Sequence, residues 1–405
     1  MERINVLYIS GSLGLGHITR DLLIANYLRK LLPEADIEWL AASPATTVLE
    51  EAGEKMVEGI DQYGNETHSA EKAAKGSRLN LANYVMKSTN DWKKNAKFFL
   101  DLIKSKNYDL VIGDETYEIE IALRKHSDMK KFPFVIIYDF VGLDSMTFNP
   151  IEHIVVYYWN RVWSSDSRKK PSYDLALFLG EPDDIPDKSF GFMLPNRRDF
   201  AKKRYTFVGY VLSFDVNSYS NKQEIRKKLG YGNEPLVICS IGGTAIGKEL
   251  LELCGEAYLI AREKIPNLHF VFVTGPRLPA ESIKLPESIE VHEFVPRLYE
   301  HFAACDLAIL QGGRTSTIEL TGLKKPFIYF PIEGHCEQAN NAQILTRLGA
   351  GLKLKLSSAT PELLAEKVIS TIGTTVSYPD IPSDGAQKAA ESIVKVLKEY
   401  KPSAL

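Results

Sequence analysis

Disulfide-forming cysteines, long apolar runs and a strong net charge are all missing from this sequence. Four cysteines occur among 405 residues, all in the second half of the chain, and none forms a Cys-x-x-Cys pair. A chain of this length can bury a large core without disulfides, so we expect free, buried thiols. The formal net charge is only −3, which excludes a strong overall attraction to nucleic acid and leaves only local charged patches.

The N-terminus also lacks the features of a signal peptide. Its apolar stretch is short and mixed, and it leads into glycines instead of a small-residue cleavage site. No apolar run reaches the length that spans a bilayer. With 44% hydrophobic and 25% charged residues, the composition is that of a globular protein, which we expect to be cytoplasmic.

Short apolar strands alternate with helical stretches, which predicts an α/β architecture with mainly parallel sheets. The predicted strands cover residues 5–10, 36–40, 109–113, 134–138 and 205–209, then 236–241, 268–274, 307–310 and 327–330. A polar, helix-favouring region covers about 69–106, and a polar linker covers 213–221. We predict an N-terminal domain over 1–212, a second domain over 213–385, and a C-terminal helix over 386–405 that packs back on the N-terminal domain.

A glycine turn follows the first predicted strand, with Gly11, Gly14 and Gly16 leading to His17. Glycines in such a turn allow close approach of a ligand to the backbone. The spacing differs from Gly-x-Gly-x-x-Gly, and no acidic residue ends the second strand. Both differences exclude a typical dinucleotide site.

His17 stands at the start of the helix that follows this turn. A helix N-terminus disfavours the imidazolium ion, so we expect a neutral imidazole able to accept a proton. Asp114 follows a buried strand at the same sheet edge and is the best candidate for orienting the ring, with Glu115 and Glu118 in reserve. The alternative is that His17 only packs or caps the turn.

A second glycine turn, Gly312-Gly313, follows the strand at 307–310. Thr315 and Ser316 open the next helix, and their hydroxyl groups with its free N–H groups predict a site for a diphosphate. Arg314 either pairs with a phosphate or lies at the surface beside the turn.

Further polar residues suit the rest of a nucleotide sugar. Glu319 lies in the first turns of the helix, where a carboxylate can accept both hydroxyls of a ribose, and Glu337 with Gln338 can bind sugar hydroxyls. A third turn, which contains Gly243 and Thr244, suits the other side of the phosphates. The main chain of Phe294 and Val295 suits the edge of a base.

Together these motifs resemble the GT-B glycosyltransferases of the UDP-glycosyltransferase superfamily, in particular the peptidoglycan-precursor N-acetylglucosaminyltransferases and the diacylglycerol glycosyltransferases. The residues that carry the resemblance are the first glycine turn with His17, Phe294-Val295-Pro296, Gly312 to Glu319, Pro326, Pro331, Glu337-Gln338 and Asn341-Ala342. The resemblance is strong over 236–351 and weak over 40–200. It implies two Rossmann-like, doubly wound domains that face each other across a cleft.

The resemblance also implies a reaction. Glu319 would bind the donor ribose, Thr315 and Ser316 the diphosphate, and Glu337-Gln338 the transferred sugar. His17 would deprotonate the acceptor hydroxyl for a direct, inverting displacement without a metal ion or another cofactor. The donor would be a UDP-sugar such as UDP-GlcNAc, and the acceptor a lipid-linked or glycan hydroxyl.

Some residues depart from the family pattern. Arg20 is not part of it, and the early turn lacks the paired glycines that many relatives carry before the histidine. The two glutamates eight residues apart that retaining GT-B enzymes carry have no counterpart, which favours inversion. His335, Cys336 and Glu337 are adjacent on one loop, and neighbours of this kind rarely converge on one metal ion.

Two other functions remain open at this point. A sugar-nucleotide 2-epimerase on the same fold would use extra acids in the first half, and Asp114, Glu115, Glu118 and Asp139 are candidates. A binding protein that retains a donor pocket without catalysis is the second alternative.

Residues 151–170 mix aromatic, aliphatic and basic side chains. They predict either peripheral contact with a lipid or a membrane interface, or an amphipathic core helix with a solvated basic end. The core helix is the simpler interpretation.

Overall fold

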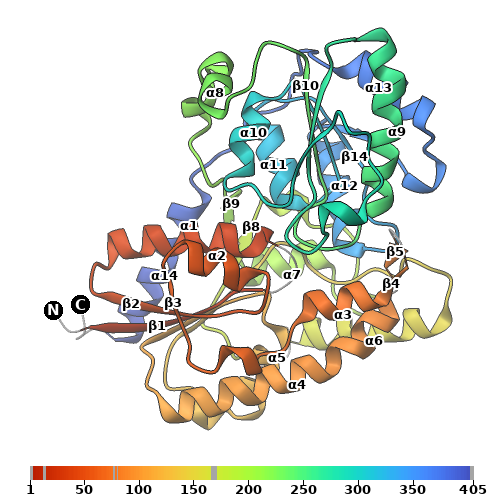
Figure 1. Cartoon of the computed structure of the whole chain (residues 1–405). Helices are drawn as coiled ribbons and strands as arrows, with labels where there is room; N and C mark the ends of the chain where they lie inside the picture. The colour runs from red at the N-terminus through yellow and green to blue at the C-terminus, as the bar shows by residue number, and fades with distance from the viewer. Residues whose placement is uncertain (1–2, 12–14, 76–77, 80, 166–170, 402–405) are drawn as a thin grey trace. The chain divides into compact units, whose positions relative to one another are not determined.

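The computed structural model describes residues 3–11, 15–75, 78–79, 81–165 and 171–401. The chain forms two compact α/β units (Figure 1). Unit 1 comprises Met1–Ala73, Leu81–Ser213 and Pro382–Leu405. Unit 2 comprises Ala74–Asn80 and Phe214–Ile381.

Unit 1 is built on a seven-stranded parallel sheet in the order β3-β2-β1-β6-β7-β8-β9. The strands are β1 (Ile4–Ile9), β2 (Ala35–Leu40), β3 (Lys55–Met56), β6 (Leu110–Asp114), β7 (Phe134–Tyr138), β8 (Leu175–Leu179) and β9 (Thr206–Gly209). Side chains alternate between two cores along β1: Val6 and Tyr8 lie in one, Leu7 and Ile9 in the other. A sheet with a core on each face requires strands that are apolar throughout, as β6 and β7 are.

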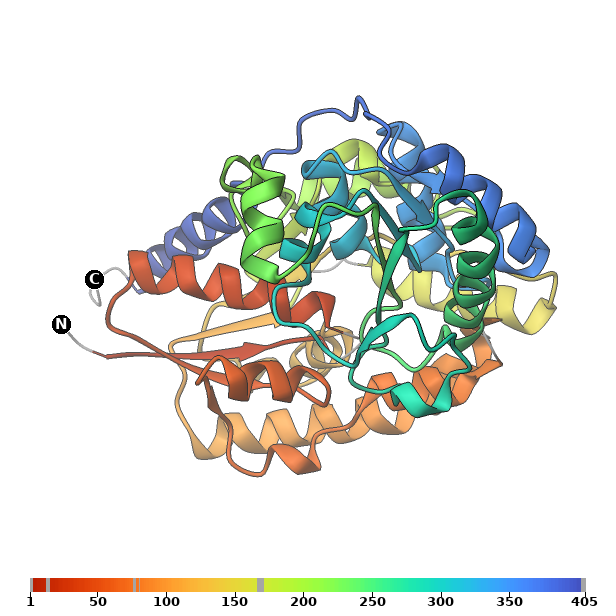
Figure 2. The ribbon, with the colours of Figure 1, turned by 45° about the horizontal axis from the view of Figure 1, so that its top comes forward.

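Helices supply the outer walls of both cores of unit 1. They are α1 (Gly16–Leu31), α2 (Ala45–Glu51), α3 (Glu66–Ala73), α4 (Leu81–Ser105), α5 (Tyr117–Lys125), α6 (Pro150–Ser164), α7 (Arg197–Arg204) and α14 (Gly385–Tyr400). Helix α14 packs beside α1 (Figure 2), and its buried alanines at 386, 389 and 390 share a core with the sheet. Unit 1 therefore contains residues from both ends of the chain.

Unit 2 contains a six-stranded parallel sheet in the order β12-β11-β10-β13-β14-β15. The strands are β10 (Leu236–Ser240), β11 (His269–Val273), β12 (Glu290–His292), β13 (Leu307–Leu310), β14 (Phe327–Tyr329) and β15 (Leu352–Lys353). The helices are α8 (Lys222–Leu229), α9 (Lys248–Lys264), α10 (Leu298–Ala304), α11 (Arg314–Gly322), α12 (Cys336–Arg347) and α13 (Pro361–Thr371). Chain order reverses between β1 and β6 in unit 1 and between β10 and β13 in unit 2, and such reversals form ligand sites in doubly wound sheets.

The predicted α/β class with two Rossmann-like units is confirmed, but several local predictions differ from the structure. Strands β3, β8 and β15 were not predicted. The helix-favouring region at 69–106 divides into α3 and α4, separated by the short antiparallel strands β4 (Ala74–Lys75) and β5 (Arg78–Leu79).

The interpretation of the 151–163 segment as an amphipathic core helix is confirmed only in part. Helix α6 buries Val156 together with the polar Glu152 and Asn160. Ile151 and Ile154, in contrast, remain 62% and 69% exposed. The buried polar groups are paired, since Glu152 accepts from Met146 N and Asn160 donates to the carbonyl oxygens of Leu143 and Phe190. Within the described residues, no helix is both long and apolar enough to cross a bilayer.

Candidate active site

In unit 1, the predicted base lies where the strand order reverses. Strands β1 and β6 are neighbours, and their carboxyl ends place the start of α1 beside Asp114, the last residue of β6. Gly16 and His17 are the first two residues of α1, while Gly14 lies outside the described residues. The structure brings His17 and Asp114 together, with 2.8 Å between His17 Nδ1 and Asp114 Oδ2, and both side chains are buried.

The ionisation of Asp114 determines which nitrogen of His17 carries the proton. Burial alone raises the pKa of Asp114, but the charge of Arg20 and the hydrogen bonds from His17 and Arg20 outweigh it and hold that pKa below its ordinary value. An ionised carboxylate only accepts hydrogen bonds, so His17 Nδ1–H donates to Asp114. The lone pair is then on His17 Nε2, as a general base requires.

The prediction that the helix N-terminus keeps the pKa of His17 low is wrong in direction. Burial and the positive charge of Arg20 both lower this pKa, but Asp114 and Asp139 together raise it above its ordinary value. The two carboxylates outweigh the opposing effects because they act on a buried ring, where charges interact strongly. His17 is therefore a stronger base than the sequence predicted.

The two reserve acids have different positions. Glu115 lies on the opposite side of the ring, with its Oε2 3.9 Å from His17 Nε2. Its backbone adopts a left-handed φ of 53°, which is uncommon for a residue other than glycine. Glu118 is not brought to His17: its carboxylate accepts hydrogen bonds from Asn95 Nδ2 and Tyr63 Oη.

Sequence reasoning missed Arg20 as a member of this site. The guanidinium group of Arg20 contacts both oxygens of Asp114 and also pairs with Asp139, which follows β7. The available signal was the spacing, because residues three apart share one face of a helix. Asp139 was considered only as an acid of an epimerase.

In unit 2, two glycine turns lie at the reversal between β10 and β13. The turn after β10 contains Gly242, which has a φ of 80°, followed by buried Gly243 and half-buried Thr244. A β-carbon on Gly275 would lie only 2.1 Å from the carbonyl oxygen of Gly242. Only glycine allows the chain after β11 to approach the turn this closely.

The side chain of Gln311, which follows β13, holds the first of these turns in place through a hydrogen bond. Gln311 Nε2 donates to the carbonyl oxygen of Ile246 at 2.6 Å, and Gly247 leaves room for that amide. The two glycine turns are therefore held together at one edge of the sheet. The sequence did not reveal this contact, because it joins residues that are far apart in the chain.

The second turn leads directly into α11. Gly313 caps the helix, and Thr315 and Ser316 lie half-buried in its first turn. Thr317 instead serves the fold, since its hydroxyl donates to the carbonyl oxygen of Gly313 and accepts from Asn341 Nδ2, both at 2.9 Å. Arg314 is buried, so the alternative of a surface arginine is wrong.

The remaining predicted donor residues lie on α11 and α12. Glu319 is in the second turn of α11 and is buried. Glu337 and Gln338 open α12, whose first turn is capped by His335 Nδ1 accepting from Gln338 N. The amide oxygen of Gln338 accepts from Ile332 N at 2.7 Å and so holds the preceding loop.

Phe294 and Val295 follow β12, at the same carboxyl edge as the turn after β10 because the sheet is parallel. Phe294 is half-buried and Val295 is buried. The predicted donor residues of unit 2 therefore all lie after strands β10, β12, β13 and β14 or on the helices that follow them.

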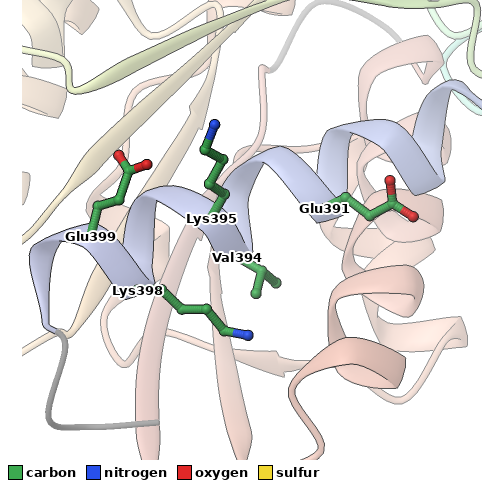
Figure 3. Close-up of a pocket in the computed structure, with 5 residues that line it drawn as sticks. All are labelled: Glu391, Val394, Lys395, Lys398 and Glu399. Atoms are coloured by element: carbon green, nitrogen blue, oxygen red, sulfur yellow. The ribbon is translucent and has the colours of Figure 1, made fainter.

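Two other kinds of site, a metal site and a ligand pocket on α14, have less support. Among the residues that the structure describes, no group of three or more His, Cys, Asp or Glu side chains is arranged to hold a metal ion. A pocket of about 360 Å³ lies on α14 (Figure 3), lined by Glu391, Val394, Lys395, Lys398 and Glu399. These side chains come from one helix and carry mixed charge, so the pocket lacks the converging polar groups of a ligand site.

Comparison with known proteins shows which families share this arrangement. Residues 237–395 match the glycosyltransferase family 28 C-terminal domain. The predicted resemblance is confirmed. One relative is the UDP-N-acetylglucosamine–N-acetylmuramyl-(pentapeptide) pyrophosphoryl-undecaprenol N-acetylglucosamine transferase of Carboxydothermus hydrogenoformans, 29% identical over 186 residues. That match covers 44% of this chain and 47% of the relative, so the chain spans about half of the relative's length.

Solved structures extend the likeness in fold to the whole chain. The calicheamicin glycosyltransferase superposes with a TM-score of 0.59 and 15% identity over 100% of both chains. A spinosyn rhamnosyltransferase complexed with thymidine diphosphate gives 0.56 and 16% over 98% of this chain and 96% of its own. At these identities the likeness shows the GT-B fold alone, and residues 237–395 carry the family 28 match within it.

Proposed function

We propose that this protein is an inverting glycosyltransferase that moves a sugar from a nucleoside diphosphate sugar to a hydroxyl acceptor. The observation that carries the proposal is the buried His17–Asp114 pair, in which an ionised carboxylate leaves Nε2 of the imidazole as a proton acceptor. The family 28 match over 237–395 supports a nucleotide-sugar site in unit 2.

In the proposed reaction, His17 Nε2 removes the proton of the acceptor hydroxyl. The acceptor oxygen attacks the anomeric carbon, and the bond from that carbon to the diphosphate oxygen breaks. The nucleoside diphosphate leaves with the electron pair, so one displacement inverts the anomeric configuration. Asp114 stabilises the imidazolium ion as it forms.

The donor would be bound by residues at the carboxyl edge of the unit 2 sheet. We assign the diphosphate to the start of α11, where helical N–H groups and hydroxyls favour an anion, and the ribose to Glu319. The sugar would contact Glu337 and the amide nitrogen of Gln338, since the amide oxygen of Gln338 is engaged in its own loop. The groups assigned to the diphosphate are Gly243, Thr244, Gly313, Arg314, Thr315 and Ser316, with the base against Phe294 and Val295.

We propose a UDP-sugar such as UDP-GlcNAc as the donor and a lipid-linked or glycan hydroxyl as the acceptor. The name of the Carboxydothermus relative contains both UDP-N-acetylglucosamine and a pyrophosphoryl-undecaprenol acceptor, and the spinosyn enzyme was solved with a nucleoside diphosphate. No metal ion enters the proposed step.

The function is tested by incubating the protein with UDP-sugars, with and without lipid or glycan extracts. We expect UDP release to depend on an acceptor and the product to carry the inverted anomeric configuration, as read by NMR. An isomeric sugar nucleotide formed without acceptor would instead indicate an epimerase. Donor binding without turnover would indicate a binding protein, and a product of retained configuration would rule out direct displacement.

An exposed apolar face on unit 1 supports a lipid-linked acceptor. It consists of Phe148, Ile151, Ile154, Tyr158, Phe192 and Met193, which are 101%, 62%, 69%, 59%, 81% and 81% exposed. The three α6 residues among them, Ile151, Ile154 and Tyr158, are spaced for one side of the helix. Tyr157 Oη donates to the carbonyl oxygen of Phe192, which ties the neighbouring loop to α6. We propose that this apolar face contacts the interface of a bilayer.

Vesicle flotation tests the membrane contact. Replacing Phe148 and Phe192 with serine removes two large apolar side chains, each expected to contribute roughly tenfold to partitioning into vesicles that contain anionic lipid. The matched control is Leu259→Ser, which removes an apolar side chain that is 51% exposed on α9. Equal flotation of the double variant and the control would contradict the assignment.

A further inference from the structure

Arg20 lies one helical turn after His17, and its guanidinium group is buried. Its Nε donates to Asp114 Oδ2 at 3.0 Å, its Nη2 donates to Asp114 Oδ1 at 2.8 Å, and its Nη1 donates to Asp139. A buried guanidinium ion is costly unless carboxylates satisfy it. Here the fork of donors engages carboxylates from the ends of two neighbouring strands, β6 and β7.

This contact fixes the carboxylate that orients the base. Asp114 Oδ2 accepts from both Arg20 Nε and His17 Nδ1, so the plane of the carboxylate follows the plane of the guanidinium group. Of the charges that keep Asp114 ionised against its burial, that of Arg20 has the largest effect. Without that charge, Asp114 would more readily take a proton and lose its preference for one tautomer of His17.

Arg20 also places a positive charge beside the imidazole. Its Nη2 is 2.7 Å from His17 Nδ1, but both atoms carry hydrogens, so the contact is a proximity and not a hydrogen bond. The hydrogens of Nη2 are taken by the two oxygens of Asp114. The positive charge of Arg20, beside Nδ1, therefore disfavours the imidazolium form of His17. The negative charge of Asp139 has the opposite effect.

We propose that Arg20, anchored by Asp139, is a positioning residue for the base. It holds the Asp114 carboxylate against His17 Nδ1 so that Nε2 presents its lone pair to the acceptor. The inference rests on the proposed role of His17 in sugar transfer. It goes beyond that role by assigning a function to an arginine outside the family pattern.

Several charged or titratable groups face His17 and must be accounted for in a titration. They are Arg20 and Asp21 on α1, Asp114 and Glu115 at the end of β6, and Asp139 after β7. Tyr8 on β1 donates to Asp21. Burial, followed by Asp114, raises the pKa of Asp21 well above its ordinary value, which favours its neutral form. Variants of Arg20 and Asp139 therefore change the charge around His17 without replacing either member of the His17–Asp114 pair.

The test measures the pKa of His17 by NMR of histidine Cε1 in the full chain and, in parallel, the pH dependence of kcat/KM for sugar transfer. In the wild type we expect the acid limb of kcat/KM to lie above the ordinary pKa of histidine, because activity is lost as pH falls through a raised pKa of His17. R20Q should move the pKa of His17 upward, and D139N should move it downward. The double variant R20Q/D139N restores the charge balance and should titrate close to the wild type.

Measurements of kcat distinguish the positioning effect of Arg20 from the effect of its charge. R20K keeps the positive charge but loses the forked hydrogen-bond donors of the guanidinium group. The pKa of His17 should therefore stay near the wild-type value, while kcat falls about 10- to 100-fold. R20Q/D139N should show the same loss of kcat. The donor KM should remain unchanged, because the donor residues belong to unit 2. Arg29→Gln is the matched control: it removes another arginine of α1, paired with Glu54 at 2.8 Å, and should leave both readouts unchanged.

Several results would overturn the inference. A shift of the His17 pKa in the same direction in R20Q and D139N, or in neither, would do so, as would normal kcat in R20K and the double variant. A purely structural role would lower the melting temperature without producing opposite pKa shifts. If the wild type transferred no sugar, the proposed function would fail, whereas the NMR titration would still decide whether Arg20 and Asp139 control His17.

Discussion

Replacing His17 with alanine is expected to lower kcat for sugar transfer by about 10²- to 10⁴-fold, the usual contribution of a general base. Donor binding should not change, because the donor residues lie in unit 2. The side chain is buried beside Asp114 and Arg20, so its loss leaves two charged groups without their neighbour. Single-turnover kinetics and calorimetric titration with UDP separate the two effects.

His126→Ala is a suitable control for this variant. It removes a histidine that is also in unit 1 but exposed, at the end of α5. His17→Gln adds a second comparison, since its amide nitrogen can still donate to Asp114 but its side chain is no base. Normal turnover in either His17 variant would contradict the assignment of the base. Loss of UDP binding in both would show instead that His17 is needed for the donor site.

Replacing Glu319 with alanine is expected to weaken UDP binding by about 10- to 100-fold, because hydrogen bonds to a charged group contribute roughly 1.5–3 kcal/mol. The carboxylate is buried in the second turn of α11, close in sequence to the hydroxyls of Thr315 and Ser316. Glu319→Gln keeps the size of the side chain and should lose less affinity. Calorimetry with UDP measures both values.

The measurement for Glu319 needs a check on folding, since the side chain is buried. The melting temperature of each variant without ligand provides it. Glu366→Ala is the control in unit 2, because that carboxylate on α13 is exposed and pairs with neighbouring Lys367. Unchanged UDP affinity in a folded Glu319→Ala variant would rule out the ribose assignment.

The sequence predicted those parts of the fold that local patterns determine. Strands at 134–138 and 307–310 have the bounds of β7 and β13, because continuous apolar runs between turn residues leave little choice. Helix α1 begins beside the predicted His17. The same reasoning missed β8 and did not separate α3 from α4. The apolar residues of these segments do not by themselves distinguish a strand from a helix.

The candidate site shows the same division. His17 and Asp114 were paired from the rule that ligands bind at the carboxyl ends of parallel strands. The contact between Arg20 and Asp139 depends on which strands are neighbours in the sheet. Local sequence patterns do not predict that order. The pKa of His17 was predicted in the wrong direction for the same reason: the helix terminus was visible in the sequence, while the second carboxylate was not.

Helix α6 shows the limit of periodicity. Its buried side holds Val156 but also Glu152 and Asn160, whose polar groups find backbone partners there. Ile151 and Ile154 lie on the exposed side instead. A pattern gives the angle between two faces of a helix and not which of them is buried. The exposed side is what supports the proposed bilayer contact.

The position of α14 has a consequence for how this protein is made. Unit 1 is completed by residues after Pro382, whereas unit 2 ends at Ile381. During synthesis, unit 2 therefore has its full sequence before unit 1 does, although unit 1 begins first. Until α14 is synthesised, the side of α1 that it covers remains exposed to water or to a chaperone. The core of unit 1, which holds His17, can therefore be completed only after this last helix has been made.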